Sequence, residues 1–234
     1  MSRNAHPAGP RHGDVLPNAQ QSALPDDVNA LDPSIWPATA TRAGGVLELG
    51  GVPVTDLVRE HGTPALFLDE ADVRARARSY TQALAGFDVF YAGKAFLCTT
   101  LARIVADEGL GLDVCTGGEL AVALAAQFPP ERIEVHGNNK SVTELTRAVE
   151  AGVGQIIVDS FDEIERLAVI TADRGVRQRV LVRVTVGVEA HTHEFIATAH
   201  EDQKFGFSLR DGSALRAVEA VLATPSLTFA GLHS

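Results

Sequence analysis

The chain has 234 residues, of which 45% are hydrophobic and 21% are charged, a balance typical of a folded globular protein and not of a disordered or fibrous one. Its net charge of −10 would repel a phosphate backbone, so we expect no nucleic-acid partner. The two cysteines are too few for a disulfide framework, and no apolar stretch has the length of a membrane span or signal peptide, so we expect a soluble cytoplasmic protein without a membrane partner.

The N-terminal region divides into two segments. Residues 1–35 are rich in proline, glycine and polar residues without a hydrophobic period, which predicts a disordered tail. In residues 36–69 the pattern predicts short strands at 46–51 and 65–69, with a small helix between them that ends at Gly62. We expect this second segment to belong to a second, β-rich domain whose remainder is missing from the sequence.

Residues 70–234 have the pattern of a barrel. An amphipathic helix is predicted over 70–85, with Val73, Ala77, Tyr80 and Leu84 on its apolar face. Six apolar segments then alternate with helical ones: DVFYAGKAF, GLDVCT, RIEVHGN, GQIIVDS, RVLVRVTV and LTFAGLHS. Strands that are apolar on both faces and are followed by helices indicate a parallel sheet covered by helices. A regular step of about 21 to 25 residues for most of them favours a (β/α) barrel over a Rossmann sheet.

The predicted fold class is therefore α/β, a (β/α)8 TIM-type barrel that is incomplete, with about six strands present. The helix starts support this register, because residues 116–119, 141–144 and 160–163 each read [ST]-x-x-E directly after a strand, the spacing of a capping box. We expect these glutamates to cap helices. For Glu119, which follows two glycines at the barrel mouth, a role in the site stays open.

Candidate catalytic residues are the polar ones at the carboxyl ends of the strands, where barrel enzymes carry their chemistry. Lys94 lies between apolar flanks and is either a nucleophilic amine or a lysine that extends to solvent. Asp113 lies in an apolar strand as a catalytic acid, a partner of Lys94, or a carboxylate bonded to backbone. Arg183 needs an anion, either a carboxylate such as Asp113 or a phosphate, and one buried ion pair would explain both residues without catalysis.

Histidines provide weaker candidates. His136, at the end of the third barrel strand, faces the pocket or bonds a loop carbonyl. His191 and His193, with Glu194 and His200 nearby, suggest either a metal site or a loop over the active site, and since no cysteine or aspartate completes a tight ligand set, we predict no metal. The motifs GxGxxG, GxSxG and the P-loop are absent, so dinucleotide, nucleotide and serine-hydrolase functions lack their signatures.

The segments KAF, DVCTGGEL, HGNNKS and EAHTHEFI…KFG occur together and in order, and in this the chain resembles the bacterial diaminopimelate decarboxylases, pyridoxal-phosphate enzymes built on an alanine-racemase-like barrel. The similarity covers about residues 45–234. It implies pyridoxal 5′-phosphate as the cofactor and decarboxylation of meso-2,6-diaminopimelate to L-lysine, the last step of lysine biosynthesis. It also implies a homodimer.

The resemblance assigns roles to the candidate residues. It implies that Lys94 holds the cofactor through its amine and that Asp113 lies near this amine. Arg183 would lie below the cofactor ring in a charge network, and His136 is a weaker cofactor-binding candidate.

The sequence ends inside the sixth strand, before the family's ring-stacking histidine, its phosphate-binding loops, its pyridine-facing glutamate and its C-terminal β domain. We therefore expect the chain to be the N-terminal part of a longer enzyme and to be inactive by itself. Two alternatives stay open. One is a sister decarboxylase acting on ornithine, arginine or a carboxylated polyamine, and the other is a non-catalytic truncated relative.

Overall fold

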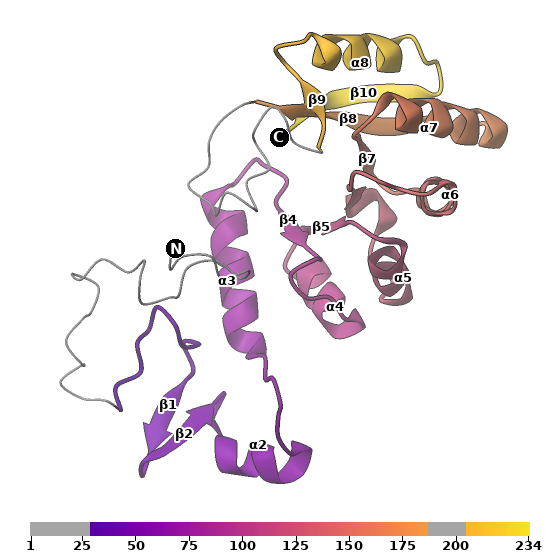
Figure 1. The fold of residues 1–234 in the computed structure, drawn as a ribbon. Helices are drawn as coiled ribbons and strands as arrows, with labels where there is room; N and C mark the ends of the chain where they lie inside the picture. Colours follow the sequence, from indigo (N-terminus) through magenta and orange to yellow (C-terminus); the bar gives the residue numbers. More distant parts are fainter. Residues whose placement is uncertain (1–28, 187–204) are drawn as a thin grey trace, which may run out of the picture. The chain divides into compact units, whose positions relative to one another are not determined.

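The structure is a computed structural model that describes residues 29–186 and 205–234. It forms two compact units that divide between Val73 and Arg74, and Figure 1 draws their described residues in indigo to magenta and in magenta to yellow. Each unit is described by itself. Most of the predicted disordered tail, residues 1–28, lies outside the described residues.

The N-terminal unit contains a small antiparallel sheet. Its strands are β1 (Thr41–Ala43), β2 (Val46–Leu49) and β3 (Val52–Pro53), in that order. Helix α2 (Val54–His61) follows β3 directly and ends at Gly62, whose φ of 76° is readily adopted only by glycine. The strand predicted from residue 46 and the helix before Gly62 are therefore confirmed.

The second predicted strand of this unit, at 65–69, is wrong. The segment has no regular secondary structure, and Leu66 and Leu68 have exposed fractions of 84% and 56%. A strand exists only where its backbone pairs with another strand, and this segment pairs with none among the described residues. The apolar pattern predicted a strand, but a pattern contains no information about whether a partner is present.

Helix α3 (Glu70–Ala83) forms where the periodicity predicts it, but its apolar stripe is not buried. None of its residues is buried, and Tyr80 is 61% exposed. Ion pairs connect the helix to its surroundings instead, because Arg74 and Arg78 both bind the carboxylate of Glu108 at 3.0 Å. Helical spacing therefore predicted the element correctly, while the burial of one face needed a packing partner that the described residues do not provide.

The second unit is built on a parallel sheet. Its main strands are β4 (Phe90–Ala92), β5 (Gly111–Val114), β6 (Ile133–Val135), β7 (Gln155–Val158), β8 (Gln178–Thr185) and β10 (Leu227–His233). The short β9 (Phe207–Ser208) pairs with the end of β8. The spatial order of the six strands follows the chain without a reversal. A doubly wound sheet reverses its order at a switch point, whereas a barrel does not, so the predicted incomplete barrel with six strands is confirmed.

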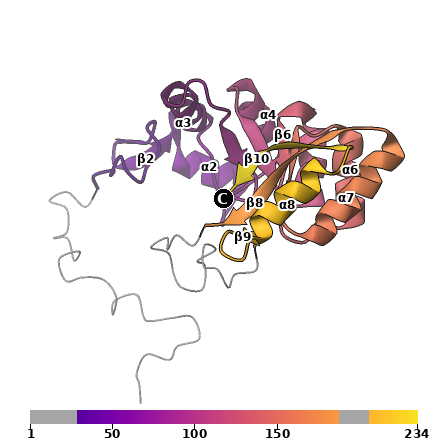
Figure 2. The same ribbon diagram turned by 90° about the horizontal axis from the view of Figure 1, so that it is seen from above.

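Helices connect the strands and cover one face of this sheet. They are α4 (Thr99–Asp107), α5 (Gly117–Ala125), α6 (Val142–Ala151), α7 (Phe161–Arg174) and α8 (Ser213–Leu222), with a 3-10 turn at Pro130–Arg132 before β6. Figure 2 shows α6, α7 and α8 along the outer side of the curved sheet. The core lies between the layers, where Leu112 and Val114 of β5 are fully buried together with Leu145 of α6 and Leu167 of α7. In the part of the chain that is described, every helix is too short or too polar to cross a bilayer.

The predicted capping boxes form at two of the three helix starts. At 116–119 and 141–144 the serine or threonine side chain and the glutamate side chain bond each other's backbone N–H. At the third, Ser160 accepts from the backbone of Glu163 at 3.2 Å, but the glutamate carboxylate accepts from the backbone N–H of Asp159 and pairs with Lys140. This glutamate is thus part of a buried charge network, which the local spacing did not predict.

Candidate active site at the carboxyl ends of the strands

Lys94 lies in a tight turn directly after β4. The backbone N–H of Gly93 donates to the carbonyl oxygen of Asp113 on β5 at 2.8 Å, and the Tyr91 hydroxyl donates to the carbonyl of Phe96 at 2.8 Å. A Cβ atom at position 93 would lie 2.9 Å from the Asp113 carbonyl oxygen, so only glycine allows this close approach. The turn therefore holds Lys94 beside the end of β5.

The amine of Lys94 is available for chemistry. The side chain is exposed, and its amine makes no hydrogen bond or ion pair with the residues that the structure describes. Its positive charge acts on the thiol of Cys115, which follows β5. By contrast, the amine of Lys140 is buried and bonds the carbonyl oxygen of Ile157 at 2.7 Å and the carboxylate of Glu163 at 2.8 Å.

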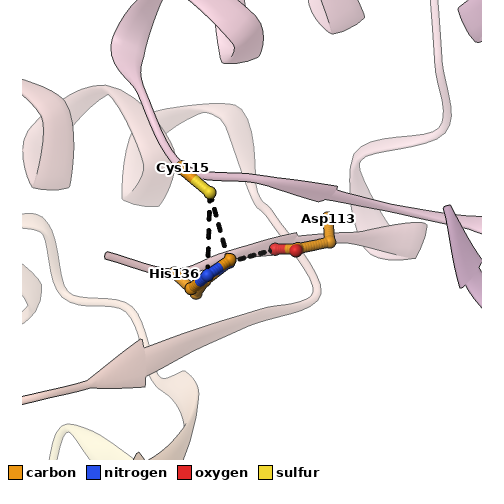
Figure 3. Close-up of side chains that lie close together, drawn as sticks. All are labelled: Asp113, Cys115 and His136. Atoms are coloured by element: carbon orange, nitrogen blue, oxygen red, sulfur yellow. Dashed lines mark hydrogen bonds and ion pairs between the residues drawn. The ribbon is translucent and has the colours of Figure 1, made fainter. Parts of the chain in front are cut away.

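Asp113, Cys115 and His136 form a cluster across β5 and β6 (Figure 3). The Oδ1 atom of Asp113 lies 2.6 Å from Nδ1 of His136, and Sγ of Cys115 lies 3.4 Å from the same nitrogen. The Asp113 and His136 side chains are only 13% and 12% exposed. The strand register brings them together, because Val114 pairs with Val135 and the backbone N–H of His136 donates to the Val114 carbonyl. Asp113 thus has an imidazole as its side-chain partner, an arrangement that sequence reasoning did not predict.

The thiol of Cys115 is held in its neutral form. Burial, followed by the nearby carboxylates of Asp113 and Glu119, raises its pKa to about 11, while the charges of Lys94 and Lys140 act in the opposite direction. The thiol is therefore protonated at neutral pH and is a weak nucleophile in this state.

Arg183 pairs with a carboxylate, but not with that of Asp113, the example considered from sequence. Its Nη1 atom lies 3.3 Å from Oδ1 of Asp159, and the guanidinium stacks on the ring of Phe205 at 4.3 Å. The other oxygen of Asp159 accepts from the backbone N–H of Gly206 at 3.1 Å. Val158 pairs with Val182, so the residues that follow them face each other, whereas Asp113 lies three strand positions away. The Asp113–Arg183 pairing considered from sequence is therefore wrong.

His233, near the end of β10, lies close to His136. Its ring lies 5.9 Å from that of His136, although β8 and β7 separate their strands, which reflects the curvature of the sheet. Its Nδ1 atom is buried and has no hydrogen-bond partner among the described residues. Burial lowers the pKa of His233, and the charges of Arg183 and His136 lower it further.

Sequence reasoning missed several of these groups. Asp159 ends the apolar segment IIVD, the same pattern that identified Asp113 in GLDV, and this signal was available. Lys140 and Glu163 form a buried pair whose side chains are 2% and 4% exposed, and their sequence context gave no comparable signal. Burial raises the pKa of Glu163, while the Lys140 ammonium opposes this shift.

Two further regions are not part of this cluster. The metal or loop interpretation of His191, His193, Glu194 and His200 concerns residues outside the described ones. A cavity of about 320 Å³ lies at the opposite, amino ends of the strands, against residues that include Phe90, Ile133 and Gln155. Because barrel chemistry is located at the carboxyl ends, this cavity does not mark the candidate site.

Comparisons with known proteins show the family to which the chain belongs. Residues 70–234 match the family described as pyridoxal-dependent decarboxylase, pyridoxal binding domain. The chain is 56% identical over 236 residues to a diaminopimelate decarboxylase of Mycobacterium leprae, covering 99% of this chain and 50% of that protein. It is 60% identical over 206 residues to the one of Mycobacterium tuberculosis, covering 87% of this chain and 46% of that protein. The chain thus spans about half the length of these curated relatives.

Solved structures agree as well. The crystal structure of diaminopimelate decarboxylase from M. jannaschii has a TM-score of 0.75 with 25% identity, covering 84% of this chain and 47% of that one. A second structure of that enzyme, with a TM-score of 0.74 and 26% identity over the same shares, is a co-complex with L-lysine. The resemblance noted in the sequence is therefore confirmed.

Proposed function

Because the chain belongs to the family of pyridoxal-dependent decarboxylases, we propose that it provides the cofactor-binding part of a diaminopimelate decarboxylase. The whole protein would remove CO2 from meso-2,6-diaminopimelate and release L-lysine. The identity of 56% to 60% with two proteins of that name supports this substrate. Since the chain spans about half of those relatives, the activity is proposed for the whole protein.

The observation that carries the proposal is the amine of Lys94, which has no partner among the described residues. The sequence has three lysines, Lys94, Lys140 and Lys204, and a pyridoxal cofactor needs a free primary amine to which its aldehyde can attach. Of the two lysines that the structure describes, Lys140 has its amine bonded in the core, whereas Lys94 presents an unpartnered amine at the carboxyl ends of the strands. The residues present therefore fit pyridoxal 5′-phosphate.

The cofactor, when bound, supplies an electron sink for the pair left on the α-carbon as CO2 departs. The chain would supply binding and orientation. Lys94 holds the cofactor, and the carboxylate of Asp113, fixed by His136 at 2.6 Å, faces the same end of the sheet. Arg183 keeps a positive charge at this end, where Asp159 and Phe205 prevent it from turning away. The buried Nδ1 of His233 is a further hydrogen-bonding atom without a partner in the described residues.

The domain organisation is proposed on the same basis. Residues 1–35 form a tail, and residues 70–234 form a partial pyridoxal-binding barrel. Residues 36–69 pair with a β domain that the rest of the protein supplies. The whole protein acts as a homodimer. The exposure of Leu66 and Leu68 and the missing strand at 65–69 support this arrangement, since apolar residues of an unpaired segment need a partner surface.

The test is borohydride reduction of the whole protein loaded with pyridoxal phosphate, followed by peptide mass spectrometry. We expect the reduced label on Lys94 and on no other lysine of the whole protein. Lys94→Ala should lose both label and turnover, while the control Lys204→Arg keeps both. Label on any other lysine of the unaltered protein, Lys140 and Lys204 included, would overturn the assignment.

A substrate panel tests the sister-enzyme alternative. A lysine/ornithine decarboxylase of Vibrio vulnificus has a TM-score of 0.60 with 21% identity, which supports a common fold alone. We expect CO2 release from meso-diaminopimelate and little from ornithine or arginine. Preference for ornithine would mean that the protein is one of the sister decarboxylases, and the proposed role of Lys94 would stay the same.

A further inference from the structure

The cluster of Asp113, Cys115 and His136 contains a thiol, an imidazole and a carboxylate whose ligand atoms all lie within 4.8 Å of one another. Figure 3 shows the three side chains converging from two neighbouring strands. These are the ligand types of zinc sites in proteins, whereas magnesium and calcium prefer oxygen ligands. The proposed decarboxylase function uses Asp113 and His136 but gives Cys115 no role.

We propose that Asp113, Cys115 and His136 form a binding site for a thiophilic divalent cation such as Zn²⁺, and that cation and cofactor exclude each other. The first half stands on the cluster alone. The second half rests on the proposed function, because Asp113, fixed by His136, faces the end of the sheet at which Lys94 is proposed to hold the cofactor.

The distances suit a tetrahedral ion. With bonds of about 2.3 Å to sulfur and 2.0 Å to nitrogen, a tetrahedral zinc ion separates the two ligand atoms by about 3.5 Å. Sγ of Cys115 lies 3.4 Å from Nδ1 of His136. The Asp113–His136 contact of 2.6 Å would have to open by less than about 1 Å, because oxygen and nitrogen ligands lie about 3.3 Å apart. A water molecule would complete the coordination.

The backbone preorganises the site. Asp113 and Cys115 are two residues apart along the same strand direction and therefore face the same side. His136 is fixed next to them by the pairing of β5 with β6. As the ion binds, the S–H bond of Cys115 breaks, its proton passes to solvent and a metal–sulfur bond forms. No change of oxidation state is needed.

The experiment is isothermal titration of ZnCl2 into the whole protein freed of cofactor, repeated with CoCl2 while the absorption spectrum is recorded. We expect one Zn²⁺ per chain at this site and a thiolate-to-cobalt charge-transfer band. Cys115→Ser should remove the band and weaken Zn²⁺ binding by about 100-fold or more. Loss of a direct ligand should weaken binding at least as much as loss of a residue that only supports a ligand. Cys98→Ser, which changes the other cysteine, is the matched control and should change neither. Thermal unfolding of both variants checks that they fold.

Several outcomes would overturn the proposal. Equal Zn²⁺ affinity in Cys115→Ser and the unaltered protein, or loss of binding only in His193→Ala, would mean that the ion binds elsewhere. Saturation with pyridoxal phosphate should lower Zn²⁺ affinity at least tenfold, and an unchanged affinity would refute the exclusion. The first titration contains no cofactor, so its result does not depend on the proposed function. Absence of the Lys94 label would refute the proposed function, whereas absence of Zn²⁺ binding would refute only the metal site.

Discussion

At the scale of single residues, the site depends on contacts between neighbouring strands that leave no room for a larger side chain. Gly93 is the clearest case, because its N–H bonds the Asp113 carbonyl while its missing Cβ leaves room for that oxygen. The glycine thus couples the position of Lys94 to the end of β5.

Gly93→Ala should therefore lower the free energy of unfolding by about 1–3 kcal/mol, the range for inserting an atom into a packed site. Gly118→Ala is the control. A Cβ at position 118 meets only the Thr116 hydroxyl at 3.8 Å, so this variant should be neutral or slightly stabilising. Urea denaturation measures both, and equal stabilities would argue against a tight contact at position 93.

The buried pair of Lys140 and Glu163 makes a second residue-scale prediction. Lys140→Met leaves a carboxylate buried without its cation and should cost about 3–5 kcal/mol in chemical denaturation. Adding Glu163→Leu should recover much of this loss, since the remaining charge is removed.

An exposed pair provides the matched control for this prediction. Arg174 contacts Glu150 at 2.8 Å, but both side chains are partly exposed, so Arg174→Met should cost only about 0–1 kcal/mol. If Lys140→Met costs no more than Arg174→Met, the buried pair does not contribute as the structure indicates.

At the scale of elements, contacts between helix N-termini connect neighbouring strand–helix repeats of the barrel. The Glu144 carboxylate closes the capping box of α6 and also accepts from the backbone N–H of Gly117, at the start of α5, at 2.9 Å. The Ser141 backbone N–H, followed by that of Gly117, lowers the pKa of this carboxyl from its ordinary value of 4.5. One side chain thus stabilises two helix N-termini.

This shift predicts a pH dependence. Because the pKa of Glu144 is lower in the folded protein than in the unfolded one, its contribution to stability is full above about pH 4.5 and is lost as the pH falls through the folded value. Glu144→Gln should lower stability at pH 7 and flatten the acid side of the stability profile. Glu165→Gln, on the exposed face of α7, should leave the profile unchanged. Thermal unfolding between pH 3 and pH 7 distinguishes the two variants, and identical profiles would contradict this role of Glu144.

At the scale of the whole molecule, the parallel sheet has central strands, which pair on both sides, and edge strands, which pair on one side. β5, β6, β7 and β8 each pair on both sides, whereas β4 pairs only with β5 and β10 only with β8 among the described residues. Strands paired on one side have fewer backbone hydrogen bonds and open more easily.

Hydrogen exchange measured by mass spectrometry should follow this order. We expect slow exchange in β5 and β7, faster exchange in β4, and the fastest exchange in the small sheet of β1 to β3, whose residues are not buried. Uniform protection across both units would show that a further surface covers the outer strands in solution.

The sequence by itself determined most of the secondary structure and the order of the barrel strands, because apolar runs, helical periods and capping spacings are local signals. It also indicated Lys94 through its apolar flanks, and the resemblance supplied the chemistry. Only the tertiary structure decided the partners of the charged groups. Strand register, which no local pattern contains, pairs Arg183 with Asp159 and brings His136 and Cys115 to Asp113. The failure of the strand at 65–69 has the same cause, since pairing depends on a partner that is distant in sequence.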